Sequence, residues 1–451
     1  MKICLQAGFG RQNITPDYAV PLAGYGATHK RMSTMVLSEI FATCIAFRQG
    51  DETILLFSQD LIRTNEKWIA PIRERVSSRT GVPVDRILVC STHTHSAPDV
   101  YSGLDCMKEY FNTLYLDALE KAAVAALEDL APATLYGTRT QTEGMNFVRH
   151  YLLENGTYAG PNFGDFKSAP IVDHAAPNDP ELLMVKLERQ EKPAILIANF
   201  QVHPTATGGG KNTVMSADFV GVTRDNVEAA TGMHFAYFTG AAGNQVLGTR
   251  LPKECDNMTS DQCRKFGGTH YMVYGWRLAQ YILKALPTLK PMAAQNMGFA
   301  RTELEYATNR ADLHLVEPAK RMREIWNEEG MAAAKAYGVP LGITSVYHAG
   351  AIISRQNRDE KGTMELDAVR IGDFSFVTMP YEAFCAHGVY VKENSPFPMT
   401  MIFSCANGGW NYVPTKEAYE YGCYESFTSY FAKGAGELVS KKLSEMLQNL
   451  K

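Results

Sequence analysis

The chain has 451 residues, of which 45% are hydrophobic, and a formal net charge of −4. Acidic and basic residues are mixed, so no Lys/Arg block predicts a nucleic-acid partner. No apolar run reaches the roughly 18 residues of a membrane-spanning helix, and the N-terminus becomes polar too soon for a signal peptide. Nine cysteines without CxxC pairs, of which only Cys255 and Cys263 are close together, indicate reduced thiols. We therefore expect a cytoplasmic protein with a small-molecule substrate, as a monomer or a homo-oligomer.

Short apolar runs that end in polar residues predict strands buried on both faces. These runs are 53–57, 87–90, 194–200, 235–238, 374–379 and 399–403. In α/β sheets, ligands gather outside the carboxyl ends of such strands. The residues that follow each run are therefore candidate site residues.

Helical periodicity predicts helices between these strands. The predicted helices are 65–79, 107–130, 271–286, 317–337 and 436–450. Strands that alternate with helices predict an α/β fold of mixed α+β layers, and we expect residues 1–451 to form a single domain. The segment 139–180 is rich in Gly, Pro and Asn, so we expect long loops there, over one face.

His93 and His95 follow the run 87–90 and are the most informative pair in the chain. Residues i and i+2 of an extended chain point to the same side, which would bring both imidazoles into one space at a strand end. Imidazole is a common zinc ligand and the usual proton carrier near neutral pH. A metal or acid/base site is one interpretation, and a hydrogen-bonded structural pair is the other.

Three further strand ends carry possible ligands, namely His203, Glu382 and Tyr412. If these ends converge on His93 and His95, the nitrogen and oxygen donors suit Zn²⁺, with Mn²⁺ or Fe²⁺ as alternatives. Taken singly, each has a plainer interpretation. His203 could be a hydrogen-bonded loop histidine, Glu382 a helix cap, and Tyr412 a half-buried ring.

The sequence resembles the neutral ceramidase superfamily in several motifs that occur in the same order. His93-Thr94-His95-Ser96-Ala97-Pro98 is similar to the family's His-Thr-His-Ser-Gly-Pro, and Val202-His203-Pro204-Thr205 matches its Val-His-Pro-Thr. The other similar segments are 7–16, 22–26, 370–372, 380–382, 412–415 and 424–425. Together they extend from the N-terminus to the last predicted helix.

The resemblance implies a ceramidase-like catalytic domain with one zinc ion bound by His93, His203, Glu382 and Tyr412. His95 would then lie near the metal as a proton donor or oxyanion stabiliser. The family reaction is hydrolysis of the amide bond of an N-acyl sphingosine, in which zinc polarises the carbonyl and activates water.

The chain departs from the family pattern in three ways. Val246 stands where the family has a serine proposed to assist catalysis. We also expect no C-terminal immunoglobulin-like domain and no export signal. The sequence therefore predicts a zinc-dependent hydrolase that cleaves an amide or ester bond in a substrate smaller or more polar than long-chain ceramide. The alternatives are a metal-dependent lyase that acts on a sugar-derived substrate and a metal-stabilised binding protein without activity.

Further residues are expected near the site. Asn146 and Arg149 resemble an Asn-Arg element that lines the family's pocket. Arg149 could clamp a carboxylate or a hydroxyl-rich substrate, or form a surface salt bridge. The turn that contains Gly240, Gly243 and Asn244 could offer backbone N–H groups to an oxyanion.

Two carboxylates and one more histidine have less specific predictions. Asp60 and Asp218 could each bind the second nitrogen of a ligand histidine, or each could cap a helix. His387 would lie on the helix after Glu382, behind the ligands.

Overall fold

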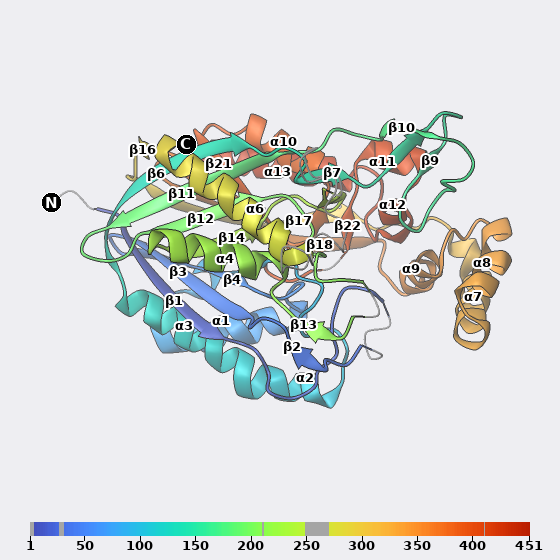
Figure 1. Ribbon diagram of the computed structural model, residues 1–451, viewed down its shortest axis with the longest axis horizontal. Coiled ribbons are helices and arrows are strands. Elements are labelled where there is room, and N and C mark those ends of the chain that lie inside the picture. The colour runs from blue at the N-terminus through green and yellow to red at the C-terminus, as the bar shows by residue number, and fades with distance from the viewer. Residues whose placement is uncertain (1–3, 27–30, 210–211, 249–269, 410) are drawn as a thin grey trace.

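The computed structural model describes residues 4–26, 31–209, 212–248, 270–409 and 411–451. Two β-sheets pack face to face, and helices cover both outer faces (Figure 1). The larger sheet contains β1 (Gln6–Asn13), β3 (Phe41–Gln49), β4 (Glu52–Gln59), β5 (Ile87–Ser91), β6 (Ala131–Gln141), β11 (Glu181–Arg189), β12 (Ile195–Phe200), β14 (His234–Thr239) and β16 (Lys290–Met292). Their order is β14-β12-β11-β6-β1-β3-β4-β5, with β16 beside β6. This mixed α/β layer architecture confirms the predicted fold class.

The smaller sheet lies against the inner face of the larger one. Its strands, in spatial order, are β17 (Met297–Ala307), β18 (Lys361–Ile371), β19 (Phe374–Met379) and β21 (Met399–Ser404). The rings of Phe238 and Phe403 stack across the interface at 4.3 Å. Every residue of β5, β19 and β21 is buried, which explains why these strands are mostly apolar on both faces.

The described residues form the following helices, some of which pack on the two outer faces of the sheets. They are α1 (Glu66–Thr80), α2 (Asp105–Glu109), α3 (Leu116–Glu128), α4 (Asp218–Thr231), α6 (His270–Ala285), α7 (Val316–Glu329), α8 (Met331–Gly338), α9 (Val346–Gln356), α10 (Cys385–Glu393), α11 (Lys416–Tyr421), α12 (Tyr424–Thr428) and α13 (Ala435–Asn449). Helices α1 and α3 cover one half of the larger sheet, and α4 and α6 cover the other. Helices α10 and α13 cover the smaller sheet.

Helix α3 lies directly on β1 because that strand has glycine where the two elements meet. A Cβ atom at Gly8 would lie 1.9 Å from the carbonyl oxygen of Ala126, and one at Gly10 would lie 2.1 Å from that of Ala122. Only glycine permits such a close approach of a helix backbone to a strand. The Gly-Phe-Gly sequence of β1 is therefore a packing feature.

The six predicted strands are all present, as β4, β5, β12, β14, β19 and β21. Two predicted helices differ from the prediction. The helix predicted at 107–130 contains a π-helical stretch, Tyr110–Tyr115, between α2 and α3. The helix predicted at 317–337 is broken at Gly330, whose φ of +93° separates α7 from α8.

We expected long loops in the segment 139–180, but the structure also has short strands there. It contains β7 (Asn146–Val148), β8 (Tyr151–Leu153), β9 (Tyr158–Ala159) and β10 (Ile171–His174). These strands are too short to show a sequence period. Four more short strands are β2 (Met35–Val36), β13 (Val214–Met215), β15 (Gln245–Leu247) and β20 (Glu382–Ala383), and β20 pairs with β22 (Tyr412–Val413).

Helices α7, α8 and α9 form an insertion between β17 and β18 and lie at one end of the molecule, on the right of Figure 1. They have a hydrophobic cluster of their own. The two strands stay paired up to Ala307 and Lys361, so the insertion starts and ends at one point. Its Tyr347 contacts Tyr424 at a ring distance of 5.8 Å.

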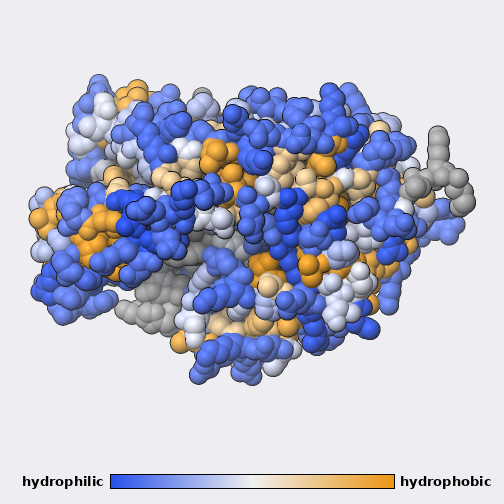
Figure 2. All heavy atoms as spheres, turned by 180° about the vertical axis from the view of Figure 1, so that it is seen from behind, coloured by the Kyte–Doolittle hydropathy of each residue, from blue (hydrophilic) through white to orange (hydrophobic). Residues whose placement is uncertain are grey.

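The surface seen from behind is mainly hydrophilic, with apolar side chains in separate patches (Figure 2). Among the described helices, none has the length and apolar character needed to cross a membrane. All seven cysteines of the described residues are free, whereas Cys255 and Cys263 lie outside the described residues.

Candidate metal centre

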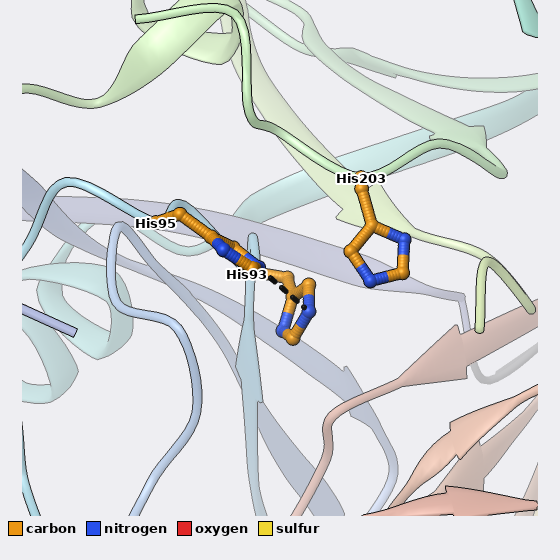
Figure 3. Close-up of side chains that lie close together, drawn as sticks. All are labelled: His93, His95 and His203. Atoms are coloured by element: carbon orange, nitrogen blue, oxygen red, sulfur yellow. Dashed lines mark hydrogen bonds between the residues drawn. The ribbon is translucent and has the colours of Figure 1, made fainter. Parts of the chain in front are cut away.

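Three imidazoles meet at the strand ends of the larger sheet. His93 and His95 follow β5, His203 follows β12, and one nitrogen of each lies within 4.8 Å of the others (Figure 3). All three side chains are buried. The convergence of strand ends expected from the sequence is thus present for these residues.

The two histidines after β5 come together for a reason that the sequence pattern does not give. The strand ends at Ser91, and His93 has a φ of +73°, so the segment is not the extended chain that the i, i+2 argument assumed. This left-handed conformation is rare and costly for a residue with a Cβ atom. It leaves the Nε2 atoms of His93 and His95 3.4 Å apart.

Backbone carbonyls fix the orientation of His93 and His203. Nδ1 of His93 lies 2.7 Å from the carbonyl oxygen of Ile62, and Nδ1 of His203 lies 2.9 Å from that of Gln245. A carbonyl only accepts hydrogen bonds, so each Nδ1 carries a proton, and each ring has its lone pair on Nε2 once that nitrogen is deprotonated. Both Nε2 atoms are therefore oriented as ligand atoms.

Glu382 brings a carboxylate to the same point. Its Oε2 lies 3.3 Å from Nε2 of His93 and 3.2 Å from Nε2 of His203, while its Oε1 lies 3.5 Å from Nη1 of Arg63. Three lone pairs that meet at one point repel one another unless a proton or a cation lies among them. The donor set of two imidazoles and one carboxylate fits zinc.

Electrostatics favour positive charge among these donors. Burial acts to lower the pKa of His93, but the negative charges of Cys405 and Glu382 raise it to about 10. Burial acts to raise the pKa of Glu382, yet the charge of His93 and hydrogen bonds from His203 and His93 hold it well below its usual range. A divalent cation bound here would replace the proton of His93, so its binding would release protons.

Tyr412 reaches the centre through a short pairing of β20 with β22. In this parallel ladder Glu382 is opposite Tyr412, so the fourth predicted ligand lies beside the third. The guanidinium carbon of Arg149 lies 5.6 Å from the centroid of the Tyr412 ring. Arg149 thus lies beside Tyr412, one of the predicted ligands.

His95 occupies a different environment from the other two histidines. Burial and the charges of His93 and His203 hold its pKa well below its usual range. Its Nδ1 is buried and has no hydrogen-bond partner among the described residues. The backbone of Gly24 lies against this ring, because a Cβ atom there would lie 2.5 Å from it, and Tyr25 contacts it at 5.1 Å.

The carboxylates proposed to support the histidines have other partners. Asp60 accepts hydrogen bonds from the backbone N–H of Phe41 at 3.0 Å and from Arg224 at 2.8 Å, so its predicted bond to a ligand histidine is wrong. Asp218 starts α4 and accepts from the N–H groups of Ala206 and Thr207. It holds the backbone just after His203, but it does not touch the ring.

Both glycines of the turn after β14 use their N–H groups within the protein. The N–H of Gly240 donates to Phe200 and that of Gly243 donates to Ala383. Oδ1 of Asn244 accepts from the N–H of Cys385 at 2.9 Å, which ties the turn to the segment after Glu382. The prediction of an oxyanion hole from the two glycines is therefore wrong.

Two other residues predicted to lie near the site, Asn146 and His387, hold parts of the fold together. Nδ2 of Asn146 donates to the carbonyls of Asp179 and Gln201 at 2.8 Å, so this side chain holds loops together. Nδ1 of His387 contacts Oγ of Ser440 on α13 at 3.1 Å, so this ring packs against the last helix. Val246 lies in β15 opposite Phe147 of β7, half-buried.

Arg149 belongs to a row of linked charged and polar side chains that the sequence did not predict. Glu425 accepts from Nε of Arg149 at 2.6 Å and contacts Nε2 of His150 at 2.7 Å. His150 is adjacent to Arg149 in the sequence, and Tyr424-Glu425 is one of the motif segments. Nothing in the sequence indicated that these residues, about 275 positions apart, form a pair.

Comparisons with known proteins bear on the fold. No family model and no curated protein matches the sequence. The crystal structure of a neutral ceramidase from Pseudomonas aeruginosa has a TM-score of 0.71 at 15% identity and covers 100% of this chain and 75% of its own. A structure described as ceramidase complexed with C2 has a TM-score of 0.69 at 15% identity, over 99% and 76%. The chain therefore shares its fold with neutral ceramidases along its whole length, as the sequence motifs predicted.

Proposed function

We propose that this protein is a zinc-dependent hydrolase that cleaves an amide or ester bond with water. One observation carries the proposal. Nε2 of His93 and Nε2 of His203 both lie within 3.3 Å of one oxygen of Glu382, and both Nδ1 atoms face backbone carbonyls. A divalent metal bound there supplies a Lewis acid for the substrate carbonyl and lowers the pKa of water.

The ligands proposed for the metal are His93, His203, Glu382 and Tyr412. The first three converge directly, and Tyr412 follows from its pairing with Glu382. Mn²⁺ and Fe²⁺ accept the same nitrogen and oxygen donors. We also propose that the whole chain is one catalytic domain, because the ligands come from both ends of the chain and from both sheets.

His95 is proposed to transfer a proton to the leaving group. Its ring lies at the histidine cluster, and its Nδ1 has no other bond among the described residues. Because Gly24 and Tyr25 pack against the ring, it is held in one orientation. A held imidazole can give and take a proton at a substrate atom within hydrogen-bond reach.

Arg149 and Asn244 complete the proposed machinery. Arg149 is proposed to bind an oxygen of the substrate beside Tyr412. Asn244 is proposed to act indirectly, because its side chain fixes the N–H of Cys385, three residues after Glu382. The side chain of Val246 has no hydroxyl, so it cannot act as the serine proposed at this position in neutral ceramidases. This difference supports a substrate other than long-chain ceramide, smaller or more polar.

The test uses the zinc-loaded full chain and a panel of N-acyl amides and esters, from acetyl to long-chain ceramide, in oxygen-18-labelled water. We expect cleavage of short acyl compounds, with label in the carboxylate product. An unsaturated product without label would identify a lyase instead. Stoichiometric zinc without turnover across the panel would identify a binding protein.

A further inference from the structure

A buried chain of hydrogen bonds lies behind Arg149. His150, Cys423 and Glu425 lie close enough to suggest a second metal site. However, both nitrogens of His150 and both oxygens of Glu425 already have bonding partners within the protein. The cluster is therefore a hydrogen-bonded assembly with another use.

Each proton in this chain can be assigned from its partners. Nδ1 of His150 lies 2.8 Å from the hydroxyl of Tyr421, and Nε2 lies 2.7 Å from Oε2 of Glu425. A carboxylate only accepts, so Nε2 of His150 donates to Glu425, and Nδ1 forms a hydrogen bond with the hydroxyl of Tyr421. The imidazole thus fixes one carboxylate oxygen and leaves the other, Oε1, to the guanidinium.

Glu425 binds only one edge of the Arg149 guanidinium. Oε1 lies 2.6 Å from Nε and 2.5 Å from Nη2, and Nη2 also lies 3.4 Å from the carbonyl of Gly243. Neither partner uses Nη1. The guanidinium carbon lies 5.6 Å from the centroid of the Tyr412 ring, and a side-chain hydrogen bond also joins Arg149 to Tyr412. The edge of the guanidinium that Glu425 does not bind therefore faces the proposed metal ligand Tyr412.

Burial makes this arrangement rigid. The side chains of His150 and Glu425 are 0% exposed, and that of Arg149 is 13% exposed. Burial acts to raise the pKa of Glu425, but the charge of Arg149 and the neighbouring His150 lower it to about 2, so the carboxylate stays ionised. A buried carboxylate held from both sides can orient a guanidinium with little freedom of rotation.

We propose that Glu425 and His150 are positioning residues that fix Arg149 beside Tyr412, so that the guanidinium edge facing Tyr412 also donates to a substrate oxygen. The contact of Arg149 with substrate rests on the proposed function, whereas its fixation by Glu425 and His150 does not. If these hydrogen bonds served only to stabilise the fold, their loss would not change the chemical reactivity of the Arg149 guanidinium.

The first experiment measures Arg149 directly, in the full chain, by its rate of modification with phenylglyoxal, read by mass spectrometry of the Arg149 peptide. We expect about a tenfold faster reaction in Glu425→Gln, and a severalfold faster reaction in His150→Phe. His150→Gln keeps an N–H donor and should restore the wild-type rate. Equal rates in wild type, Glu425→Gln and His150→Phe would overturn the proposal.

The control variant removes an ion pair of similar type at a distance from the site. Glu365 on β18 pairs with Arg73 at 2.6 Å and with Arg301 at 3.2 Å. Glu365→Gln should lower stability and leave the reactivity of Arg149 unchanged. If it accelerates modification as much as Glu425→Gln, loosening of the fold explains the effect and the proposal fails. His150→Phe keeps the Arg149–Glu425 pair and serves if Glu425→Gln does not fold.

The second experiment tests the contact with substrate through acetohydroxamate, titrated calorimetrically into the zinc-loaded chain. We expect affinity to fall about tenfold in Glu425→Gln and in His150→Phe, with zinc content unchanged, and to recover in His150→Gln. If modification rates change as expected but the probe binds all variants equally, Arg149 is fixed but does not bind this oxygen, and that part of the proposal is overturned. Absence of turnover with both results as expected would count against the hydrolase alone.

Discussion

Nε2 of His203 lies 3.2 Å from Oε2 of Glu382, although 179 positions separate the two residues in the sequence. The contact joins the end of β12 in the larger sheet to the segment after β19 in the smaller one. A site built this way requires both sheets to be packed correctly. The ligands and the fold are therefore tested together by the following experiments.

Replacement of His93 by alanine should remove the metal. The wild type should contain about one zinc per chain after dialysis, and His93→Ala much less, because one of the converging donors is lost. Inductively coupled plasma mass spectrometry measures the content. His387→Ala is the control, since His387 contacts Ser440 and should leave zinc unchanged. Equal zinc in wild type and His93→Ala would refute the assignment of this ligand.

Replacement of His95 by alanine should separate proton transfer from metal binding. We expect zinc content to stay at the wild-type level while turnover falls by roughly 10²-fold or more. The measurement pairs metal analysis with initial rates on the best compound of the amide and ester panel. Unchanged turnover would remove the catalytic role of His95, and lost zinc would make it a ligand.

Gly24→Ala should disturb His95 through contact. The new Cβ atom would lie 2.5 Å from the ring, and φ at this position is +112°. We expect a loss of about 1–3 kcal/mol in the free energy of unfolding from the backbone alone, and a drop in turnover from the displaced ring. Gly81→Ala is a matched control, since φ is +74° and nothing lies within 4 Å of the added atom. The control should lose stability and keep turnover, as measured by urea denaturation and initial rates.

Acid should destabilise the protein in part through Glu425. Its pKa is about 2 in the folded chain and 4.5 in the reference state, so the folded form binds the proton more weakly. The resulting stability, roughly 3 kcal/mol, is present above pH 4.5 and is lost as the pH falls towards 2. Urea denaturation between pH 6 and pH 3 should show a shallower decline for Glu425→Gln than for the wild type. Parallel curves would contradict this linkage.

The elements that sequence predicted well are those whose pattern is local. The buried strands β5, β19 and β21 are mostly apolar on both faces, and their ends were located to within a residue. The break at Gly330 and the π-helical stretch 110–115 were missed because an apolar stripe continues through both.

The sequence predicted the part of the candidate site that consists of side-chain ligands, but not the part that consists of backbone groups. Imidazole and carboxylate ligands have recognisable residue types, whereas the carbonyls of Ile62 and Gln245, which orient two of the imidazoles, could belong to any residue. Asp60 had a suitable position and residue type, but Arg224 was the stronger partner. Pairings such as His150 with Glu425 depend on the packed fold.

The insertion α7–α9 leaves and re-enters the smaller sheet at the paired ends Ala307 and Lys361. Its length and sequence can change without a shift in the register of any strand that carries a ligand. Because Tyr347 of this insertion touches Tyr424, next to Glu425, such a change would remodel the surroundings of the site while the donors stay in place. The fold thus separates the strand ends, which hold the donor side chains, from the insertion α7–α9, which can vary and so alter which molecules the site accepts.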